Sequence, residues 1–197
     1  MNYQDFLDFW FSPAAEPNWF VKSAEFDAVL AEKFTDVLQQ AAQGELWTWR
    51  ETPAGRLAEI IVLDQLSRNL YRNDPRAFAQ DGMALVLAQE MIHLKLDQDL
   101  NPTERRFLYM PFMHSESKRI HEVALTLFES LNDPTVLGYE LKHKVIIERF
   151  GRYPHRNQIL GRQSSAEELE FLTQPNSKFL IKTRFILPLQ YLHRRTA

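Results

Sequence analysis

The sequence predicts an all-α fold built from stacked antiparallel helical hairpins. Hydrophobic residues recur at helical spacing along nearly the whole chain. The short alternating runs of β-branched residues that mark strands are missing. Because the segments between the expected helices are short, successive helices should pack against each other as hairpins.

The first half of the chain reads as three helices. A short helix over 3–10 precedes the proline-bearing loop SPAAEPNW, and a second helix begins at Ser23 and ends at Gly44, a residue typical of helix C-termini. Thr52 is a candidate N-cap for a third helix that is apolar almost all round. Such a helix belongs in the middle of the fold.

The second half continues the helical pattern. Pro111 is expected to stop or kink one helix, and Ser165 with Glu168 forms a capping box for the last one, overlapped by Ser164 with Glu167. The breaks recur roughly every 30 residues, which is near the period of helical repeats. Helices are expected at about 74–96, 102–111, 116–131, 133–150 and from 165 onward.

Length and composition indicate one globular domain. A chain of 197 residues with 45% hydrophobic and 12% aromatic residues can bury a continuous core. We expect a single all-helical domain over 1–179 and an apolar, basic extension over 180–197. That extension is expected to pack on its own domain or on a second copy in a homodimer, rather than on a membrane surface.

Several classes of protein are disfavoured. The N-terminus lacks the basic region of a secretory or transit peptide and no apolar run reaches the length of a membrane span, so a cytoplasmic location is expected. The absence of cysteine excludes disulfides and thiolate zinc sites. The six histidines show no tight ligand spacing, and glycine-rich phosphate loops are missing, so neither a metal nor a cofactor is expected. A net charge of -3 gives no global attraction to nucleic acid.

A polar ladder interrupts the central helix. Asp64 and Arg68 are one turn apart, as are Gln65 and Asn69, and Arg72 follows Arg68 at the same spacing. Asp64 shares a stripe with apolar residues, so it is expected to be partly buried and to need partners. The purely structural alternative is that Asp64 and Arg68 form an ion pair that only orients neighbouring helices.

A second polar group lies around Pro111, in the stretch PTERRFLYMPFMHSESKR. His114, Ser115 and Glu116 fall within one turn and could support acid–base or nucleophilic chemistry. The alternative is that Ser115 caps the following helix and Glu116 complements its dipole.

The third group is RFGRYPHRNQILGR, residues 149–162, which contains four arginines and no carboxylate. Their repulsion must be relieved. Either acids such as Asp64, Glu104 and Glu116 reach the segment from other helices, or the segment gathers around a bound anion, which arginine binds through two hydrogen bonds.

The segments IIVLDQLSRNLYR, PRAFAQD, ERRFLYMPFMHSE and RFGRYPHRNQILGR resemble the uncharacterised bacterial domain-of-unknown-function family 924, from about residue 3 to about residue 179. The resemblance implies a fold of the tetratricopeptide-repeat-like type, a right-handed array of helical pairs, and no known activity. The family pattern tends to read Phe-Pro where this chain has Leu66-Ser67, so a straighter central helix is expected here. The signature implied by the resemblance comprises Asp64, Gln65, Arg68, Asn69, Arg72, Glu104, Arg105, Arg106, His114, Ser115, Glu116, Arg152, His155, Arg156, Asn157, Gly161 and Arg162.

Three functional hypotheses follow. The first is a pocket that binds a small phosphorylated or carboxylated anion. The second is a hydrolase or transferase with His114 or His155 as general base, oriented by Glu116 or Asp64. The third is a protein–protein interaction scaffold, because stacked hairpins form concave surfaces. The ligand-binding residues expected for the first are Arg68, Asn69, Arg72, Arg105, Arg106, Arg152, Arg156, Asn157 and Arg162.

Overall fold

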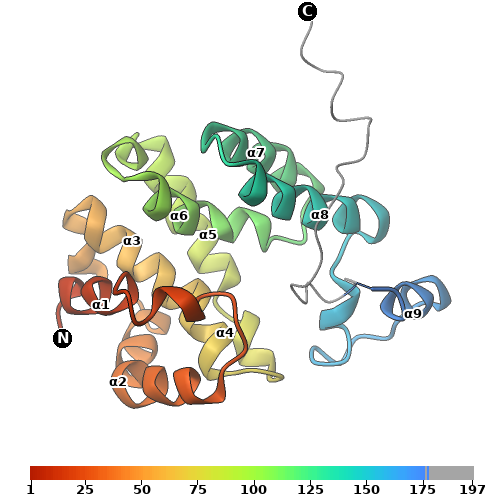
Figure 1. Ribbon diagram of the computed structural model, residues 1–197, viewed down its shortest axis with the longest axis horizontal. Coiled ribbons are helices and arrows are strands. Elements are labelled where there is room, and N and C mark those ends of the chain that lie inside the picture. Colours follow the sequence, from red (N-terminus) through yellow and green to blue (C-terminus); the bar gives the residue numbers. More distant parts are fainter. Residues whose placement is uncertain (176, 178–197) are drawn as a thin grey trace, which may run out of the picture.

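A computed structural model describes residues 1–175 and Ser177, which form helices joined by short turns, with no β-strand among them (Figure 1). This confirms the all-α prediction. No helix within the described part is long and apolar enough to cross a membrane. The expected extension over 180–197 lies outside the described residues.

The N-terminal helices begin and end where their capping residues predict. Helix α1 (Tyr3–Trp10) begins after Asn2, whose side chain forms a capping box with Asp5. Helix α2 (Ala24–Ala42) begins after Ser23, which accepts from the Phe26 N–H, and the chain turns at Gly44 with a φ of +73°. The 3₁₀ turns η1 (Glu16–Asn18) and η2 (Trp47–Glu51) follow α1 and α2.

The central helical segment changes its winding part-way along. It runs through α3 (Pro53–Ile61), the π-helical turn η3 (Val62–Leu66) and α4 (Ser67–Leu70). Every residue from 57 to 67 is buried, as expected for a helix that is apolar almost all round. The straighter helix expected here is thus interrupted by η3, and π turns of this kind recur at functional sites.

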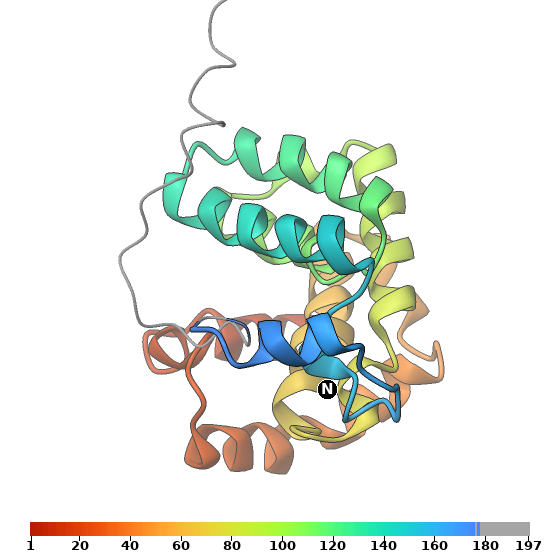
Figure 2. The same ribbon diagram turned by 90° about the vertical axis from the view of Figure 1, so that its right-hand side faces the viewer.

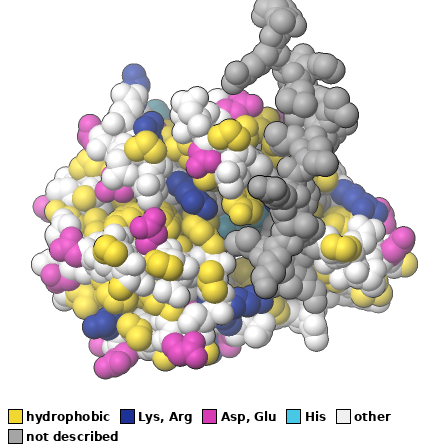
Figure 3. Space-filling view, in the orientation of Figure 1, with side chains coloured by type: hydrophobic (Ala, Val, Ile, Leu, Met, Phe, Trp, Pro, Cys, Tyr) yellow, Lys and Arg dark blue, Asp and Glu magenta, His cyan; other side chains and the backbone are white. Residues whose placement is uncertain are grey.

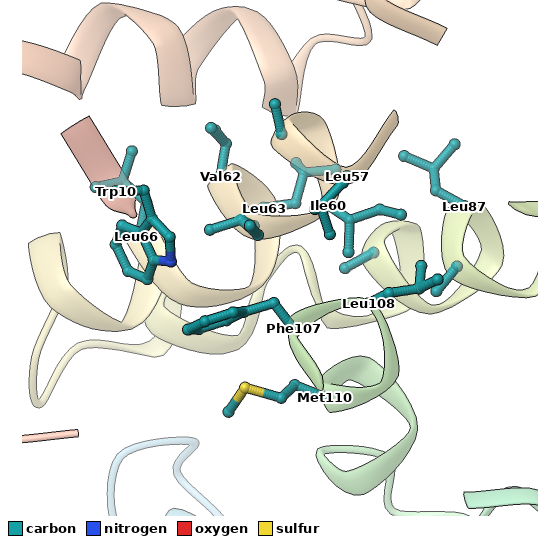
Figure 4. Close-up of a cluster of buried hydrophobic side chains, with 14 of the residues drawn as sticks. Trp10, Leu57, Ile60, Val62, Leu63, Leu66, Leu87, Phe107, Leu108 and Met110 are labelled. Carbon is teal, nitrogen blue, oxygen red and sulfur yellow. The ribbon is translucent and has the colours of Figure 1, made fainter. Parts of the chain in front are cut away.

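The hydrophobic core surrounds this segment. Helix α3 packs against α1, α5 and α6. Figure 4 shows Phe107 and Leu108 of α6 beside Ile60 and Leu63 of the central segment, and all four side chains are at most 1% exposed. The burial removes the central segment from water, which is the main favourable term for its folding.

The second half contains the expected helices with three differences. The pattern expected over 74–96 divides into the 3₁₀ turn η4 (Pro75–Phe78) and helix α5 (Asp81–His93), and another turn, η5 (Leu96–Asp99), follows. Helix α6 (Pro102–Met113) continues past Pro111, because a proline this close to the end removes one hydrogen bond and two residues complete the turn. Helix α7 (Lys118–Ser130) is capped by Ser117, so the alternative that Ser115 is the cap is wrong.

The last elements return the chain to the central segment. Helix α8 (Pro134–Phe150) packs against α7, and it ends at Gly151 with a φ of +69°. The following loop contains η6 (Pro154–Arg156) and leads to α9 (Ala166–Leu172), where the Ser165–Glu168 capping box forms. Figure 2 shows this loop beside the segment that follows α4. The right-handed repeat array and the single-domain boundaries stay predictions.

Candidate functional site

A cavity of about 350 Å³ lies where η4, the start of α5, the end of α6 and the loop after α8 meet. One side is apolar and includes Phe78, Leu85, Pro111 and Leu160. The polar side consists of Asp81, His114, Ser115, Glu116 and Arg156. Four of the residues singled out from the sequence therefore line one hollow: His114, Ser115, Glu116 and Arg156.

Asp64 lies behind this cavity, on the π turn η3. Its side chain is 1% exposed, and its Oδ1 lies 2.7 Å from His114 Nδ1 and 3.2 Å from an Arg68 nitrogen. Gln65 Nε2 donates to the other oxygen at 2.5 Å. Burial alone would raise the pKa of Asp64, but the charge of Arg68 and the contact with His114 hold it well below its usual range. Asp64 is therefore a buried carboxylate at neutral pH.

His114 connects this carboxylate to the cavity. Burial and the positive charge of Arg68 lower its pKa, so its imidazole is neutral at pH 7. Because ionised Asp64 can only accept, the Nδ1–H of His114 donates to it, and Nε2 is left as an acceptor. A neutral imidazole whose second nitrogen is held by a carboxylate is the state that a general base requires.

Two arginines share Asp81 at the edge of the cavity. Arg68 donates to both carboxylate oxygens of Asp81, at 2.8 and 3.0 Å, and Arg156 Nη1 donates to Oδ2 at 3.1 Å. The Arg156 guanidinium lies 4.5 Å from the ring centre of Phe78 and 4.6 Å from that of Tyr153. This stacking fixes a nearly buried cation beside His114.

Glu116 is bound from the loop after α8. Arg162 donates to both of its oxygens, at 2.6 and 2.9 Å, and the Tyr153 N–H donates at 2.8 Å. Asn157, which is fully buried, accepts from Arg162 Nε at 3.0 Å. Burial opposes ionisation of Glu116, but the Arg162 hydrogen bonds lower its pKa. Glu116 is thus a carboxylate bound by Arg162 and by the backbone of the loop after α8.

The sequence and the fold were compared with known families, curated proteins and solved structures. The sequence matches the family model described as bacterial protein of unknown function (DUF924) over residues 6–176. The chain belongs to this family. A solved structure, that of the protein of unknown function ATU0120 from Agrobacterium tumefaciens, is 37% identical, with a TM-score of 0.82 over 86% of this chain and 96% of that chain. Among curated proteins, none matches.

Other residues of the DUF924 signature lie away from the cavity. Asn69 and Arg72 both donate to Asp27 of α2. Arg152 forms two hydrogen bonds with Glu168, at 2.6 and 2.7 Å. These contacts join elements of the fold and do not line the hollow.

Three further candidates are also outside the lining. The Arg106 guanidinium lies 4.3 Å from the ring centre of Phe20, and Arg105 Nε is buried without a hydrogen-bond partner among the described residues. The ring of His155 lies 5.5 Å from that of Tyr153, and burial lowers its pKa to about 3. Of the two histidines considered as bases, His114 is the one that lines the cavity.

The positive charge of residues 149–162 is balanced. Each arginine there forms an ion pair: Arg149 with Glu167, Arg152 with Glu168, Arg156 with Asp81, and Arg162 with Glu116. Carboxylates from other parts of the chain therefore relieve the repulsion, and an excess of positive charge does not accumulate there. Figure 3 likewise shows the Lys and Arg side chains of one face scattered among Asp and Glu side chains.

Sequence reasoning missed Asp81 as a site residue in this DUF924 chain. Its two partners are 13 and 75 residues away, so no local spacing relates them. Tyr153 was missed for the same reason, since its hydroxyl donates to the Met113 carbonyl across 40 residues. The only available signal was their place within the segments that resemble the family.

Proposed function

We propose that the cavity beside His114 binds a small molecule and that His114 acts there as a general base in a hydrolytic or transfer reaction. The observation that carries this proposal is the 2.7 Å contact between buried Asp64 and a histidine that lines a cavity. A volume of about 350 Å³ fits a small ligand. The mixed lining favours a ligand with one apolar and one polar part.

The residues have separate roles in this proposal. His114 Nε2 accepts the proton of a water or hydroxyl group as its oxygen bonds to the carbonyl carbon or phosphorus of the ligand. The bond from that atom to the leaving group then breaks, and the His114 imidazolium returns the proton to the leaving group. Asp64 holds the Nδ1–H and stabilises the imidazolium that results. The guanidinium of Arg156, on the cavity wall, stabilises negative charge that develops on the ligand.

The test is turnover of p-nitrophenyl acetate and p-nitrophenyl phosphate. Loss of a general base slows the reaction by about 100- to 10 000-fold, so His114→Ala should lose most of any turnover. His93→Ala is the matched control, because His93 is exposed. Equal rates for wild type and His114→Ala, or equal losses in both variants, would refute the assignment.

Binding of a small anion is the second candidate function. Arg68 pairs with both Asp64 and Asp81, whereas Arg156 pairs with Asp81 alone, and Arg156 Nε is buried without a hydrogen-bond partner in the described part of the chain. A phosphorylated or carboxylated ligand could bind Arg156 in place of Asp81. This candidate does not need His114 to transfer a proton.

A thermal-shift panel of phosphorylated and carboxylated metabolites tests it. A ligand at a hundred times its dissociation constant stabilises a fold by about 2.7 kcal/mol. The shift should disappear in Arg156→Ala and persist in Arg149→Ala, because Arg149 pairs with Glu167 away from the cavity. A shift that survives in Arg156→Ala would place the anion elsewhere. The interaction scaffold and the homodimer stay predictions.

A further inference from the structure

The turn that carries His114 is held by an unusual set of hydrogen bonds. The last carbonyls of a helix lack partners within the helix. Here three successive carbonyls accept from buried side chains: Met113 from the Tyr153 hydroxyl at 2.6 Å, His114 from Arg156 Nη2 at 3.0 Å, and Ser115 from His121 Nε2 at 2.9 Å. The donors come from α7, from η6 and from the loop between α8 and η6. The backbone of the turn is therefore tied to three separate parts of the fold.

His121 itself is held by a buried acid. Its Nδ1 lies 2.7 Å from Oε1 of Glu140 on α8, and both side chains are fully buried. Since the Ser115 carbonyl can only accept, Nε2 of His121 must carry a proton. The remaining question is which of the two groups carries the proton between Nδ1 and Oε1.

Burial favours the protonated form of Glu140 over its carboxylate. Burial raises the pKa of Glu140, and its Oε2 has no hydrogen-bond partner among the described residues, so an ionised carboxylate would be costly there. In the protonated form, Oε1 of Glu140 donates to Nδ1 of His121. His121 then donates from Nε2 to Ser115, with Tyr153 Oη 3.1 Å away as a second acceptor, and the Tyr153 hydroxyl donates to Met113. Each hydrogen bond in this network is thus donated in the direction of the His114 turn.

Such a polar network is not the simplest way to hold α7 and α8 together. Replacing buried polar pairs by apolar residues of similar volume is often neutral or stabilising. The network ends on the backbone of the His114 turn instead of joining the helices to each other. Because a misplacement of about 1 Å can cost about a hundredfold in rate, a turn that carries a base benefits from rigid support.

We propose that Glu140, His121 and Tyr153 are positioning residues that hold the His114 turn so that Nδ1 stays on Asp64 and Nε2 stays directed to the cavity. This rests on the proposed function of His114, which it deepens. None of the three residues lines the cavity, so their effect on a ligand passes through the turn.

The test follows the His114 imidazole by NMR of its ring nitrogens, which needs no ligand. In the wild type we expect the Nδ1–H tautomer and a pKa below the ordinary value of about 6.5. His121→Phe keeps a ring but removes the donor, so His114 should lose its single tautomer and its pKa should rise toward that value. Tyr153→Phe removes only the hydroxyl and should act in the same direction, and it carries the test if His121→Phe does not fold.

Glu140→Gln is the conservative variant. An amide N–H can replace the carboxyl proton as the donor to Nδ1 of His121, so the His114 signals should match those of the wild type. His93→Phe is the matched control for a histidine replaced on the surface.

Two results would overturn the inference. One is an unchanged His114 spectrum in folded His121→Phe or in Tyr153→Phe. The other is a disturbance in Glu140→Gln as large as in His121→Phe. Turnover that does not depend on His114 would refute the proposed function and would leave the NMR result standing, so the two failures can be distinguished.

Discussion

At the scale of single residues, Asp64 is the group on which the site depends. A buried carboxylate is tolerated only when it is paired and hydrogen-bonded. Asp64 meets this condition through Gln65, Arg68 and His114, which together hold its pKa low. Its negative charge also selects the tautomer of His114, so structure and proposed chemistry share this one contact.

Asp64→Asn tests the energetic part of this argument. The variant keeps the size of the side chain and removes the charge that Arg68 and His114 face. Hydrogen bonds to charged groups contribute about 1.5–3 kcal/mol, and we expect the free energy of unfolding to fall by about that amount. Urea denaturation measures it.

Asp74→Asn serves as the control, because the Asp74–Arg76 pair lies at the surface, with side chains 34% and 63% exposed. Exposed ion pairs contribute about 0–1 kcal/mol. Equal losses for the two variants would show that Asp64 is no more than a surface charge in energetic terms.

The sequence predicted part of this residue-level arrangement. Asp64 shares a helical stripe with apolar residues, which correctly predicted a buried acid in need of partners. Its pairing with His114 spans 50 residues and its partner Arg68 also binds Asp81, and neither relation has a local pattern. Long-range pairs of this kind depend on how helices pack, which a periodicity does not specify.

At the scale of elements, capping chemistry decided the helix boundaries. Thr52 and Ser165 begin their helices as predicted, because their oxygens accept from backbone N–H groups that the first turn leaves free. The π turn η3 was not predicted, since a single extra residue in a helix leaves the hydrophobic pattern almost unchanged. The alternative that Ser115 caps α7 was wrong because Ser117, two residues later, satisfies the same local rule and caps the helix instead.

The junction of η2 with α3 provides an element-scale prediction. A Cβ added at Gly55 would lie 2.0 Å from the Trp49 carbonyl oxygen, so Gly55→Ala must push the two elements apart. Overpacking of this kind costs about 1–3 kcal/mol. Thermal unfolding monitored by circular dichroism should show a clear loss of stability.

Gly138→Ala is the matched comparison within α8. A Cβ there meets no atom of the described residues within 4 Å, and alanine is favoured over glycine inside a helix by about 0.5–1 kcal/mol. This variant should be more stable than the wild type. If both substitutions changed stability in the same direction, the close approach at Gly55 would not be the cause.

At the scale of the whole molecule, three partly buried histidines make the fold sensitive to acid. Burial lowers the pKa of His114, His143 and His155, the last to about 3. The unfolded chain binds these protons at about pH 6.5, whereas the folded chain does not until the pH is lower. Stability is therefore fully present above about pH 6.5 and is lost as the pH falls toward the folded-state values.

This predicts a falling free energy of unfolding between pH 7 and pH 5. Each proton taken up on unfolding contributes about 1.4 kcal/mol per pH unit. The raised pKa of Glu140 has the opposite effect on the pH dependence of stability. It involves one proton against three for the histidines, so the free energy of unfolding still falls as the pH falls. Urea titrations at several pH values should show the slope, and His155→Gln should flatten it while His93→Gln should not. A slope unchanged by His155→Gln would contradict the assignment.

The ion pair between Asp81 and Arg156 has a consequence for folding during translation. The two residues are 75 positions apart, and Asp81 leaves the ribosome first, able to meet only Arg68. At about 5–20 residues per second, the second arginine follows about 4 to 15 s later. The N-terminal helices can thus assemble around their core early, whereas the cavity beside His114 is among the last parts to be completed during translation.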